Sequence, residues 1–268
     1  MNFGLIIIGD EILSGKRADK HLPKVIELLD ARGLGLSWAR YVGDDPARIT
    51  ADLNDAFASG DVVFSCGGIG ATPDDHTRQC AAAALGVPLA LHPQARDFVI
   101  ERMHDIAREQ GTTFDPERED NRHRLNMAVF PEGAEIIPNP YNKIAGFAVR
   151  RGAGGVFFVP GFPVMAWPMI EWVLDTHFRA LHTASGTRER SVIVFGAMEA
   201  ALTPLMEAIE AEFARVKVFS LPSVDHPEYG RHIELGVKGD PGLLVAAFAR
   251  LVDGLKTHGA KLGPELVR

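Results

Sequence analysis

Hydrophobic positions in the first part of the chain alternate between strand-like runs and helical spacing. A continuous apolar run at 3–8 predicts a strand buried on both faces, and segments 34–42 and 61–66 predict two further strands. Helical patterns follow these strands at 22–29, at 49–57 and in an alanine-rich segment that ends at Leu85. Strands and helices in alternation predict an α/β fold, a mostly parallel sheet with helices on both faces.

The pattern becomes less regular after this alternation. Residues 93–110 predict a helix, whereas 111–124 are polar without periodicity and predict an exposed excursion. Short strands are expected at 128–130, 135–137 and 148–150, followed by a buried strand at 155–159. Prolines at 160 and 163 end that strand, and 165–178 predict a helix.

A segment of small and polar residues at 181–188 predicts a linker, and a new series of strand and helix patterns begins after it. Strands are expected at 192–195, 216–221 and 231–237, with helices at 202–213 and 243–255. This βαββα order predicts a small α+β domain. The expected organisation is an α/β domain over 1–180, the linker, and the second domain over 189–268.

Composition excludes several classes of protein. Of the 268 residues, 46% are hydrophobic and 24% charged, values that exclude disorder and a membrane-embedded chain. A net charge of −7 argues against nonspecific nucleic-acid binding. Two cysteines exclude a disulfide scaffold, and no basic segment precedes the first apolar run as in a secretory signal. We expect a cytoplasmic protein with neither membrane nor nucleic-acid partners.

The most informative stretch is the glycine-rich segment that follows the third predicted strand, 67–77 (GGIGATPDDHT). A glycine loop between a parallel strand and a helix is a common place for a ligand, because its N–H groups and the helix N-terminus favour an anion. Its candidate phosphate-binding residues are Gly67, Gly68, Gly70, Thr72, Asp74 and Thr77. Asp74 and Asp75 would repel a bare phosphate but suit a bridging Mg²⁺. Alternatively, both carboxylates only stabilise the start of the helix.

Further carboxylates follow the first two predicted strands. Gly9, Asp10 and Glu11 end the first strand, and Asp44 follows the second. Adjacent parallel strands bring these residues to one edge of the sheet, where they suggest metal-assisted phosphoryl chemistry, although turn formation explains each aspartate equally well. The loop lacks the third glycine of a dinucleotide fingerprint, and segment 9–16 departs from a P-loop in spacing and in having Arg17 at the metal-binding position.

Five motifs in order resemble the amino-terminal region of the CinA family, whose core is a MoaB/Mog-like molybdopterin-binding domain. They are GDEILSGK, VGDD, GGIGATPDDHT, PEGAEIIPNP and VPGFP, and the resemblance covers the chain from Met1 to about Phe178. It implies a three-layer α/β/α domain, commonly a homo-oligomer. The remaining segment resembles the small KH-like domain that follows this core in CinA. The chain ends before the deamidase domain of longer CinA proteins, so that activity is not expected.

The resemblance also implies a ligand and a site. The ligand is a phosphate-bearing pterin, such as molybdopterin, or a nucleotide, and CinA-type members are similar to pyrophosphatases that act on ADP-ribose and related dinucleotides, with Mg, Mn or Co. The residues matching functional aspartates are Asp75 and Asp44, expected to be catalytic and, with Asp10, to hold the metal. Further ligand contacts are expected at Asn139, Lys143, Pro160 and Gly161.

Three departures from the family pattern keep alternatives open. Ala71 replaces a proline of the glycine loop, segment 142–147 (NKIAGF) lacks a glycine and a proline, and Met165 replaces a glutamate. Our leading hypothesis is a metal-dependent nucleotide-diphosphate hydrolase. A binding module without catalysis and a structural oligomer without a ligand are the alternatives.

Overall fold

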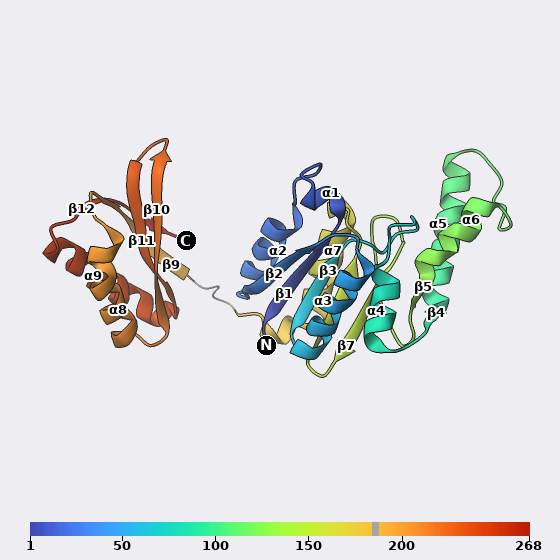
Figure 1. Ribbon diagram of the computed structural model, residues 1–268, viewed down its shortest axis with the longest axis horizontal. Helices are drawn as coiled ribbons and strands as arrows, with labels where there is room; N and C mark the ends of the chain where they lie inside the picture. Colours follow the sequence, from blue (N-terminus) through green and yellow to red (C-terminus); the bar gives the residue numbers. More distant parts are fainter. Residues whose placement is uncertain (184–187) are drawn as a thin grey trace. The chain divides into compact units, whose positions relative to one another are not determined.

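A computed structural model describes residues 1–183 and 188–268. The predicted linker 181–188 therefore lies partly outside the described residues, at 184–187. The chain divides into two compact units, one of Met1–Ala31 and Gly35–His182 and the other of Arg32–Leu34 and Thr183–Arg268. Figure 1 shows the helices and strands of each unit.

The first unit is built on a six-stranded sheet with the order β2-β1-β3-β8-β7-β6. Strands β2, β1, β3 and β8 are parallel, whereas β7 runs antiparallel to both of its neighbours, β8 and β6. The bounds are β1 Phe3–Ile8, β2 Leu36–Val42, β3 Val62–Cys66, β6 Glu135–Ile137, β7 Gly146–Arg151 and β8 Gly154–Val159. Every residue of β1, β3 and β8 is buried, which confirms that their apolar runs form the centre of the sheet.

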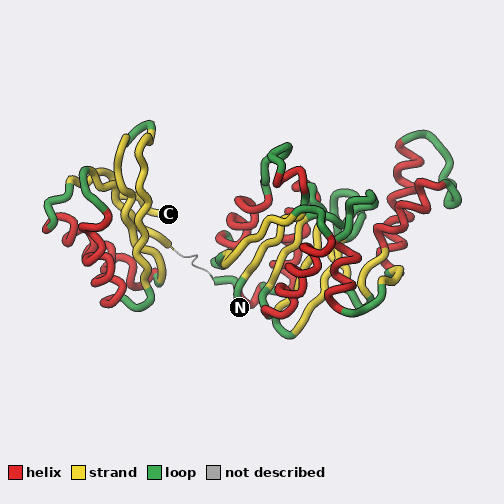
Figure 2. Tube along the Cα trace, in the orientation of Figure 1, coloured by secondary structure: helices red, strands yellow, loops and turns green. Residues whose placement is uncertain are grey.

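Helices cover both faces of this sheet, as Figure 2 shows. Their bounds are α1 Asp10–Leu13, α2 His21–Asp30, α3 Pro46–Ser59, α4 Thr77–Leu85 and α7 Pro163–His177. Ile49 and Leu53 of α3 pack against Ile6 and Phe158 on one face. On the other face, the ring of Phe178 meets Phe157 edge-on at 5.5 Å. The three-layer α/β/α prediction is confirmed.

Two helices, α5 Pro93–Glu109 and α6 Glu119–Arg124, project from the sheet as an arm (Figure 1). A short antiparallel pair, β4 Leu89–Leu91 and β5 Val129–Pro131, and the 3₁₀ turn η1 Leu125–Ala128 join the arm to the domain. The prediction of an irregular excursion over 111–124 was wrong in its last part, because α6 forms there around the buried Asn121.

The strand register brings the carboxyl ends of the parallel strands together. Ile8 pairs with Val42, Ile7 with Cys66, and Cys66 with Val159. The backbone N–H of Gly9 donates to the Val42 carbonyl and that of Gly67 to the Val159 carbonyl, each at 3.0 Å. The segments that follow the strands therefore leave the sheet side by side, as the sequence predicts.

The second unit has the order β9 Arg188–Phe195, α8 Glu199–Glu212, β10 Val216–His226, β11 Gly230–Gly239, α9 Pro241–Thr257 and β12 Lys261–Val267. Its antiparallel sheet has the strand order β10-β11-β9-β12. Val194 and Leu235 of the sheet pack with Leu251 and Leu255 of α9. The final strand β12 was not predicted and completes a βαββαβ unit. No helix among the described residues of either unit combines the length and apolar character needed to cross a bilayer.

Candidate functional site

A cavity of about 930 Å³ opens at the carboxyl edge of the parallel strands. Three parts of the first unit enclose it: the segments that follow the strands, one face of the arm, and the start of α7 with the loop that precedes it. Glycine-loop residues 67–72 line it, together with Asp74 and Asp75. In open α/β sheets, ligands bind at this edge, so the cavity is the candidate site.

The glycine loop approaches its neighbours too closely for side chains. A Cβ added to Gly67 would lie 2.3 Å from the Ile8 carbonyl oxygen, and one added to Gly68 would lie 2.1 Å from Thr77 Oγ1. Both glycines also have positive φ values, 110° and 69°, which other residues rarely adopt. Glycine at these two positions lets the loop pack against Ile8 and Thr77, and it leaves the loop backbone uncovered by side chains there.

Two side chains of α4 hold the loop from beneath. The buried Thr77 donates its hydroxyl to the Gly67 carbonyl at 3.1 Å, and its backbone N–H donates to the Gly68 carbonyl at 3.0 Å. Arg78, 5% exposed, donates Nη2 to the Gly70 carbonyl at 2.6 Å. Burial lowers the pKa of Arg78, and Asp75 opposes that shift. The sequence pointed to Thr77 but not to Arg78, the buried cation at the next position in the chain.

Asp75 is fixed against the loop rather than free in solvent. Its Oδ2 accepts from the Thr72 backbone N–H at 2.9 Å and from the Thr72 hydroxyl at 2.5 Å. A Cβ on Gly70 would lie 2.5 Å from the same oxygen, so any residue other than glycine at position 70 would displace this carboxylate. The Asp75 side chain is half-buried and lines the cavity. Its other oxygen therefore remains available for a ligand or a metal.

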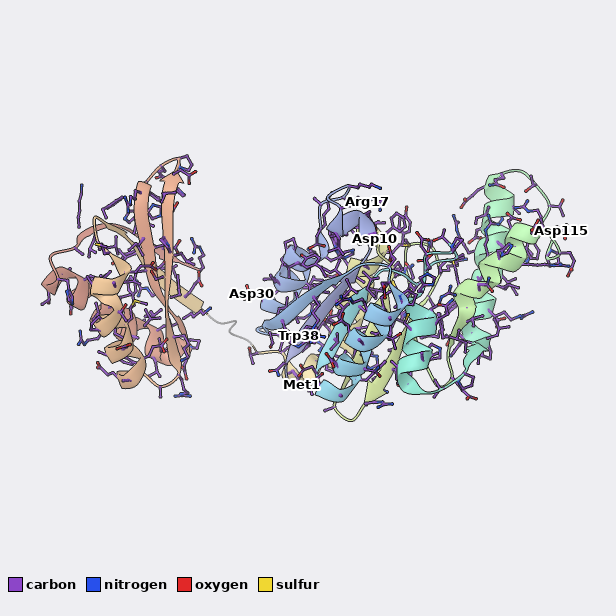
Figure 3. All side chains as sticks on the ribbon, viewed as in Figure 1. Met1, Asp10, Arg17, Asp30, Trp38 and Asp115 are labelled. Atoms are coloured by element: carbon purple, nitrogen blue, oxygen red, sulfur yellow. The ribbon has the colours of Figure 1, made fainter. Side chains whose placement is uncertain are left out.

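Asp10 and Asp44 form a reciprocal pair at the ends of β1 and β2. Asp44 Oδ2 accepts from the Asp10 N–H at 2.9 Å, and Asp10 Oδ1 accepts from the Asp44 N–H at 3.2 Å. Burial raises the pKa of Asp44, and the charges of Asp10, Glu11 and Asp74 raise it further. Asp10 lies on this edge of the domain together with Arg17 (Figure 3). Four carboxylates therefore share one edge, an electrostatic cost that a cation would relieve.

The donor set fits a metal that shares its coordination with a ligand. Among the described residues, no three His, Cys, Asp or Glu side chains gather closely enough to hold a metal ion by themselves. Mg²⁺ needs only one or two protein carboxylates when phosphate oxygens and water complete its shell. The Asp10–Asp44 pair fits that role, because a cation would offset both the burial and the neighbouring charges that raise the pKa of Asp44.

The remaining predicted residues divide into two groups. Pro160 and Gly161 line the cavity, and the Gly161 carbonyl lies 3.0 Å from Nε2 of the buried His21. Asn139 and Lys143, in contrast, are absent from the cavity lining. Asn139 is buried and bonds within its own loop, and Lys143 Nζ pairs with Asp105 at 2.9 Å and Glu101 at 3.3 Å.

Sequence reasoning missed the basic and apolar parts of the cavity. The lining residues that were not predicted are Lys16, Arg17, Val99, Arg102, Met103, Ile106, Arg124, Met127, Ile144 and Phe162. The half-exposed ring of Phe162 lies 5.7 Å from the Arg17 guanidinium. The apolar helical spacing of the arm residues resembles that of any core-facing helix, so it gave no signal of a ligand surface.

The position of the missing family glutamate also faces the cavity. Met165 and Asn142 both line it, and the Asn142 Nδ2 donates to the Met165 sulfur at 3.2 Å. Asn142 Oδ1 accepts from the Ile144 N–H at 3.0 Å, so the amide is held by its own loop. This chain therefore presents a thioether and an amide where a carboxylate was expected.

Comparisons with known proteins agree with this geometry. A family model described as "Probable molybdopterin binding domain" matches residues 4–180. A CinA-like protein of Anaeromyxobacter dehalogenans (strain 2CP-C) is 36% identical over 181 residues, which cover 67% of this chain and 42% of the relative. A CinA-like protein of Citrifermentans bemidjiense is 32% identical over 218 residues, 81% of this chain and 50% of the relative. The chain thus spans half or less of these two relatives.

One solved structure supports the fold. The crystal structure of "the protein CinA with unknown function" from Thermoplasma acidophilum superposes with a TM-score of 0.56 at 24% identity, covering 65% of this chain and 98% of that chain. The matched family model covers nearly all of the unit that contains the cavity. The chain therefore belongs to the probable molybdopterin-binding domain family and resembles its CinA-like members.

Proposed function

We propose that the first unit binds a phosphate-bearing nucleotide or pterin at the glycine loop and, with a divalent metal, hydrolyses the diphosphate of a ligand such as ADP-ribose or FAD. The observation that carries the proposal is the glycine loop itself. Gly67, Gly68 and Gly70 each sit where a Cβ would meet another atom within 2.5 Å, next to clustered carboxylates. Such a backbone surface suits phosphate oxygens, and the carboxylates suit a metal that bridges to them.

The chain's own groups have distinct roles in this proposal. The loop N–H groups of 68–71 bind the diphosphate, Thr72 holds Asp75 in place, and Thr77 and Arg78 fix the conformation of the loop. Asp44 and Asp10 would hold the metal, and Asp75 would contribute its free oxygen to the metal or to the attacking water. A bound divalent cation would supply charge neutralisation and a lower pKa for that water.

The test is release of AMP from ADP-ribose, FAD and NAD⁺ by the full chain, followed by chromatography with Mg²⁺, Mn²⁺ or Co²⁺ and with a chelator. We expect metal-dependent AMP that falls at least about 100-fold in Asp75→Asn. Asp45→Asn is the matched control, because Asp45 caps α3 and does not line the cavity. Equal rates in wild type and Asp75→Asn would refute the assignment of Asp75.

A second candidate function rests on Met165. A thioether replaces the expected carboxylate, and Asn142 approaches it. This arrangement favours a binding module that holds a molybdopterin or nucleotide without turning it over. Binding of ADP-ribose by calorimetry, with no AMP under any metal, would favour this candidate over hydrolysis.

A further inference from the structure

The arm presents one continuous face to the cavity. Val99, Arg102, Met103 and Ile106 of α5 have the spacing i, i+3, i+4 and i+7, which places them on one side of the helix. Arg124, at the end of α6, lines the same cavity. The arm therefore contributes two guanidinium groups in addition to an apolar wall.

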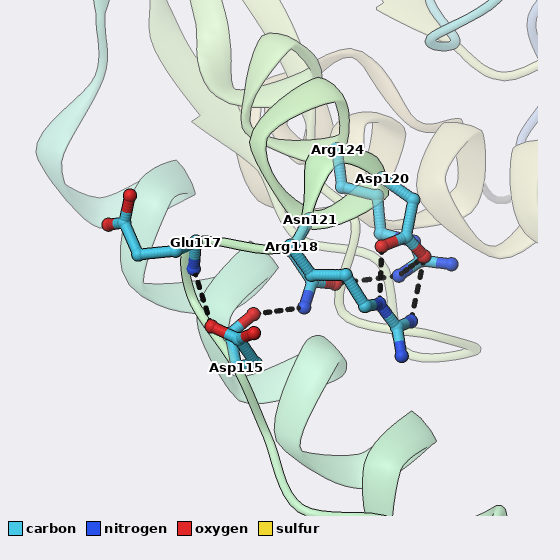
Figure 4. Close-up of polar contacts among 6 residues, drawn as sticks. All are labelled: Asp115, Glu117, Arg118, Asp120, Asn121 and Arg124. Atoms are coloured by element: carbon cyan, nitrogen blue, oxygen red, sulfur yellow. Dashed lines mark hydrogen bonds and ion pairs between the residues drawn. The ribbon is translucent and has the colours of Figure 1, made fainter.

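Arg124 is held in place by the polar network drawn in Figure 4. Its Nη1 donates to Asn121 Oδ1 at 2.7 Å and lies 2.9 Å from Asp120 Oδ2. The buried Asn121 in turn donates to the Asp115 carbonyl at 2.7 Å. Arg118 binds both oxygens of Asp120, and its hydrogen bond lowers the pKa of Asp120 to about 2. Asp120 thus remains an ionised anchor for Arg124.

This network leaves part of the guanidinium free. The contacts of Arg124 use Nη1 alone, so its Nε and Nη2 have no protein partner among the described residues. Arg102 binds Glu109 through Nη1 and Nη2, which leaves its Nε. Glu109 and Asp120 do not line the cavity, whereas both arginines do. Each guanidinium can therefore bind a further acceptor from the cavity side.

The carboxylates of the cavity are confined to one side of it. Those that line it, Glu11, Asp44, Asp74 and Asp75, all belong to the segments that follow the strands, where Lys16 and Arg17 also line the cavity. The arm lining contains two arginines and no carboxylate, with Val99, Met103 and Ile106 as its apolar residues. An anion at the arm can therefore bind guanidinium directly, without a carboxylate beside it in the lining.

We propose that Arg124, with Arg102, forms a second anion subsite that binds a terminal phosphomonoester of the ligand. The inference rests on the proposed function, since the diphosphate of the same ligand occupies the glycine loop. The ligand class is a dinucleotide-like organophosphate with an apolar or aromatic middle and an extra phosphate at the end near the arm. Arginine suits this role because its planar fork matches phosphate oxygens.

The test compares NADP⁺ with NAD⁺, which differ by one phosphomonoester, and includes inorganic pyrophosphate as a probe of the glycine loop alone. Affinities are measured by calorimetry with the full chain and Ca²⁺, an oxygen-binding divalent cation outside the set tested for turnover. We expect NADP⁺ to bind at least about tenfold tighter than NAD⁺. Arg124→Gln should reduce that preference below about threefold, while its affinities for NAD⁺ and pyrophosphate stay at the wild-type values.

Two further variants complete the design. Arg102→Gln should weaken the preference in the same direction. Arg122→Gln should keep it, because Arg122 lies on the same helix, pairs with Glu117 and does not line the cavity. Pyrophosphate binding without a preference for NADP⁺, or a preference that survives both Arg124→Gln and Arg102→Gln, would overturn the arm subsite alone. Failure of pyrophosphate and both dinucleotides to bind would overturn the glycine-loop site and the subsite together.

Discussion

Substitution of Gly70 by alanine is a sharp test of the Asp75 position. The new Cβ would lie 2.5 Å from Asp75 Oδ2, so the carboxylate must move by about 1 Å to reach ordinary van der Waals contact. That movement disrupts the two hydrogen bonds from Thr72. A misplacement of about 1 Å in a catalytic group costs about 100-fold in rate, or about 2.7 kcal/mol in the activation barrier.

The assay is metal-dependent AMP release from ADP-ribose, with the unfolding free energy measured alongside. Gly70 lacks a positive φ and its loop is largely exposed, so Gly70→Ala should change the unfolding free energy by less than about 1 kcal/mol. Gly35→Ala is the control, because a Cβ at Gly35 meets open space. Full activity in a folded Gly70→Ala variant would show that the position of Asp75 does not matter, and would refute the reasoning.

Three further predictions concern the residues around the cavity. Because burial and neighbouring carboxylates raise the pKa of Asp44 above the unfolded value of 3.8, its ionised form destabilises the fold as the pH rises. Asp44→Asn should therefore melt at a higher temperature than wild type at pH 7. This difference should shrink as the pH falls and vanish at about pH 3, where the carboxyl is protonated in both states; a lower melting temperature at pH 7 would contradict it. Thr77→Val removes a buried hydroxyl that donates to the Gly67 carbonyl, and it should lower the free energy of unfolding in urea by about 1–3 kcal/mol. The control is Thr50→Val, which should lower it by about 0.5 kcal/mol, because the Thr50 hydroxyl donates to the Pro46 carbonyl at an exposed site. Equal losses in the two variants would show that the Gly67 contact is not special. Met165→Glu places a carboxylate in the cavity and should raise the rate of metal-dependent AMP release by about tenfold, or about 1.4 kcal/mol in the activation barrier. Met127→Glu, at another residue of the cavity lining, should not raise this rate. A lower rate in Met165→Glu would argue that the thioether belongs to the site.

The central strands of the first unit were predictable because a strand buried on both faces leaves a short, continuous apolar run in the sequence. Segments 3–8 and 61–66 are mostly apolar, and burial on both faces is what such runs favour. The edge where Gly9 and Gly67 meet followed from parallel pairing alone. The glycine loop was also recognisable, because glycines between a strand and a helix have few structural uses.

The rest of the site depends on tertiary contacts that local patterns do not encode. Arg102 and Arg124 belong to surface helices, where arginine is ordinary, and only the position of the arm brings them to the cavity. Lys143 was expected to meet a phosphate, but it pairs with Glu101 and Asp105 of α5, 42 and 38 positions earlier in the sequence. Strand β12 is interrupted by Gly263 and Pro264, which hid its alternation.

The most direct test of the account is a crystal structure of the full chain with ADP-ribose and Mg²⁺. The account predicts diphosphate oxygens within hydrogen-bonding distance of the backbone N–H groups of 68–71, and a cation between those oxygens and the Asp10–Asp44 pair. An ADP-ribose molecule bound elsewhere, with the glycine loop contacting only water, would contradict the central claim that this loop is the phosphate site.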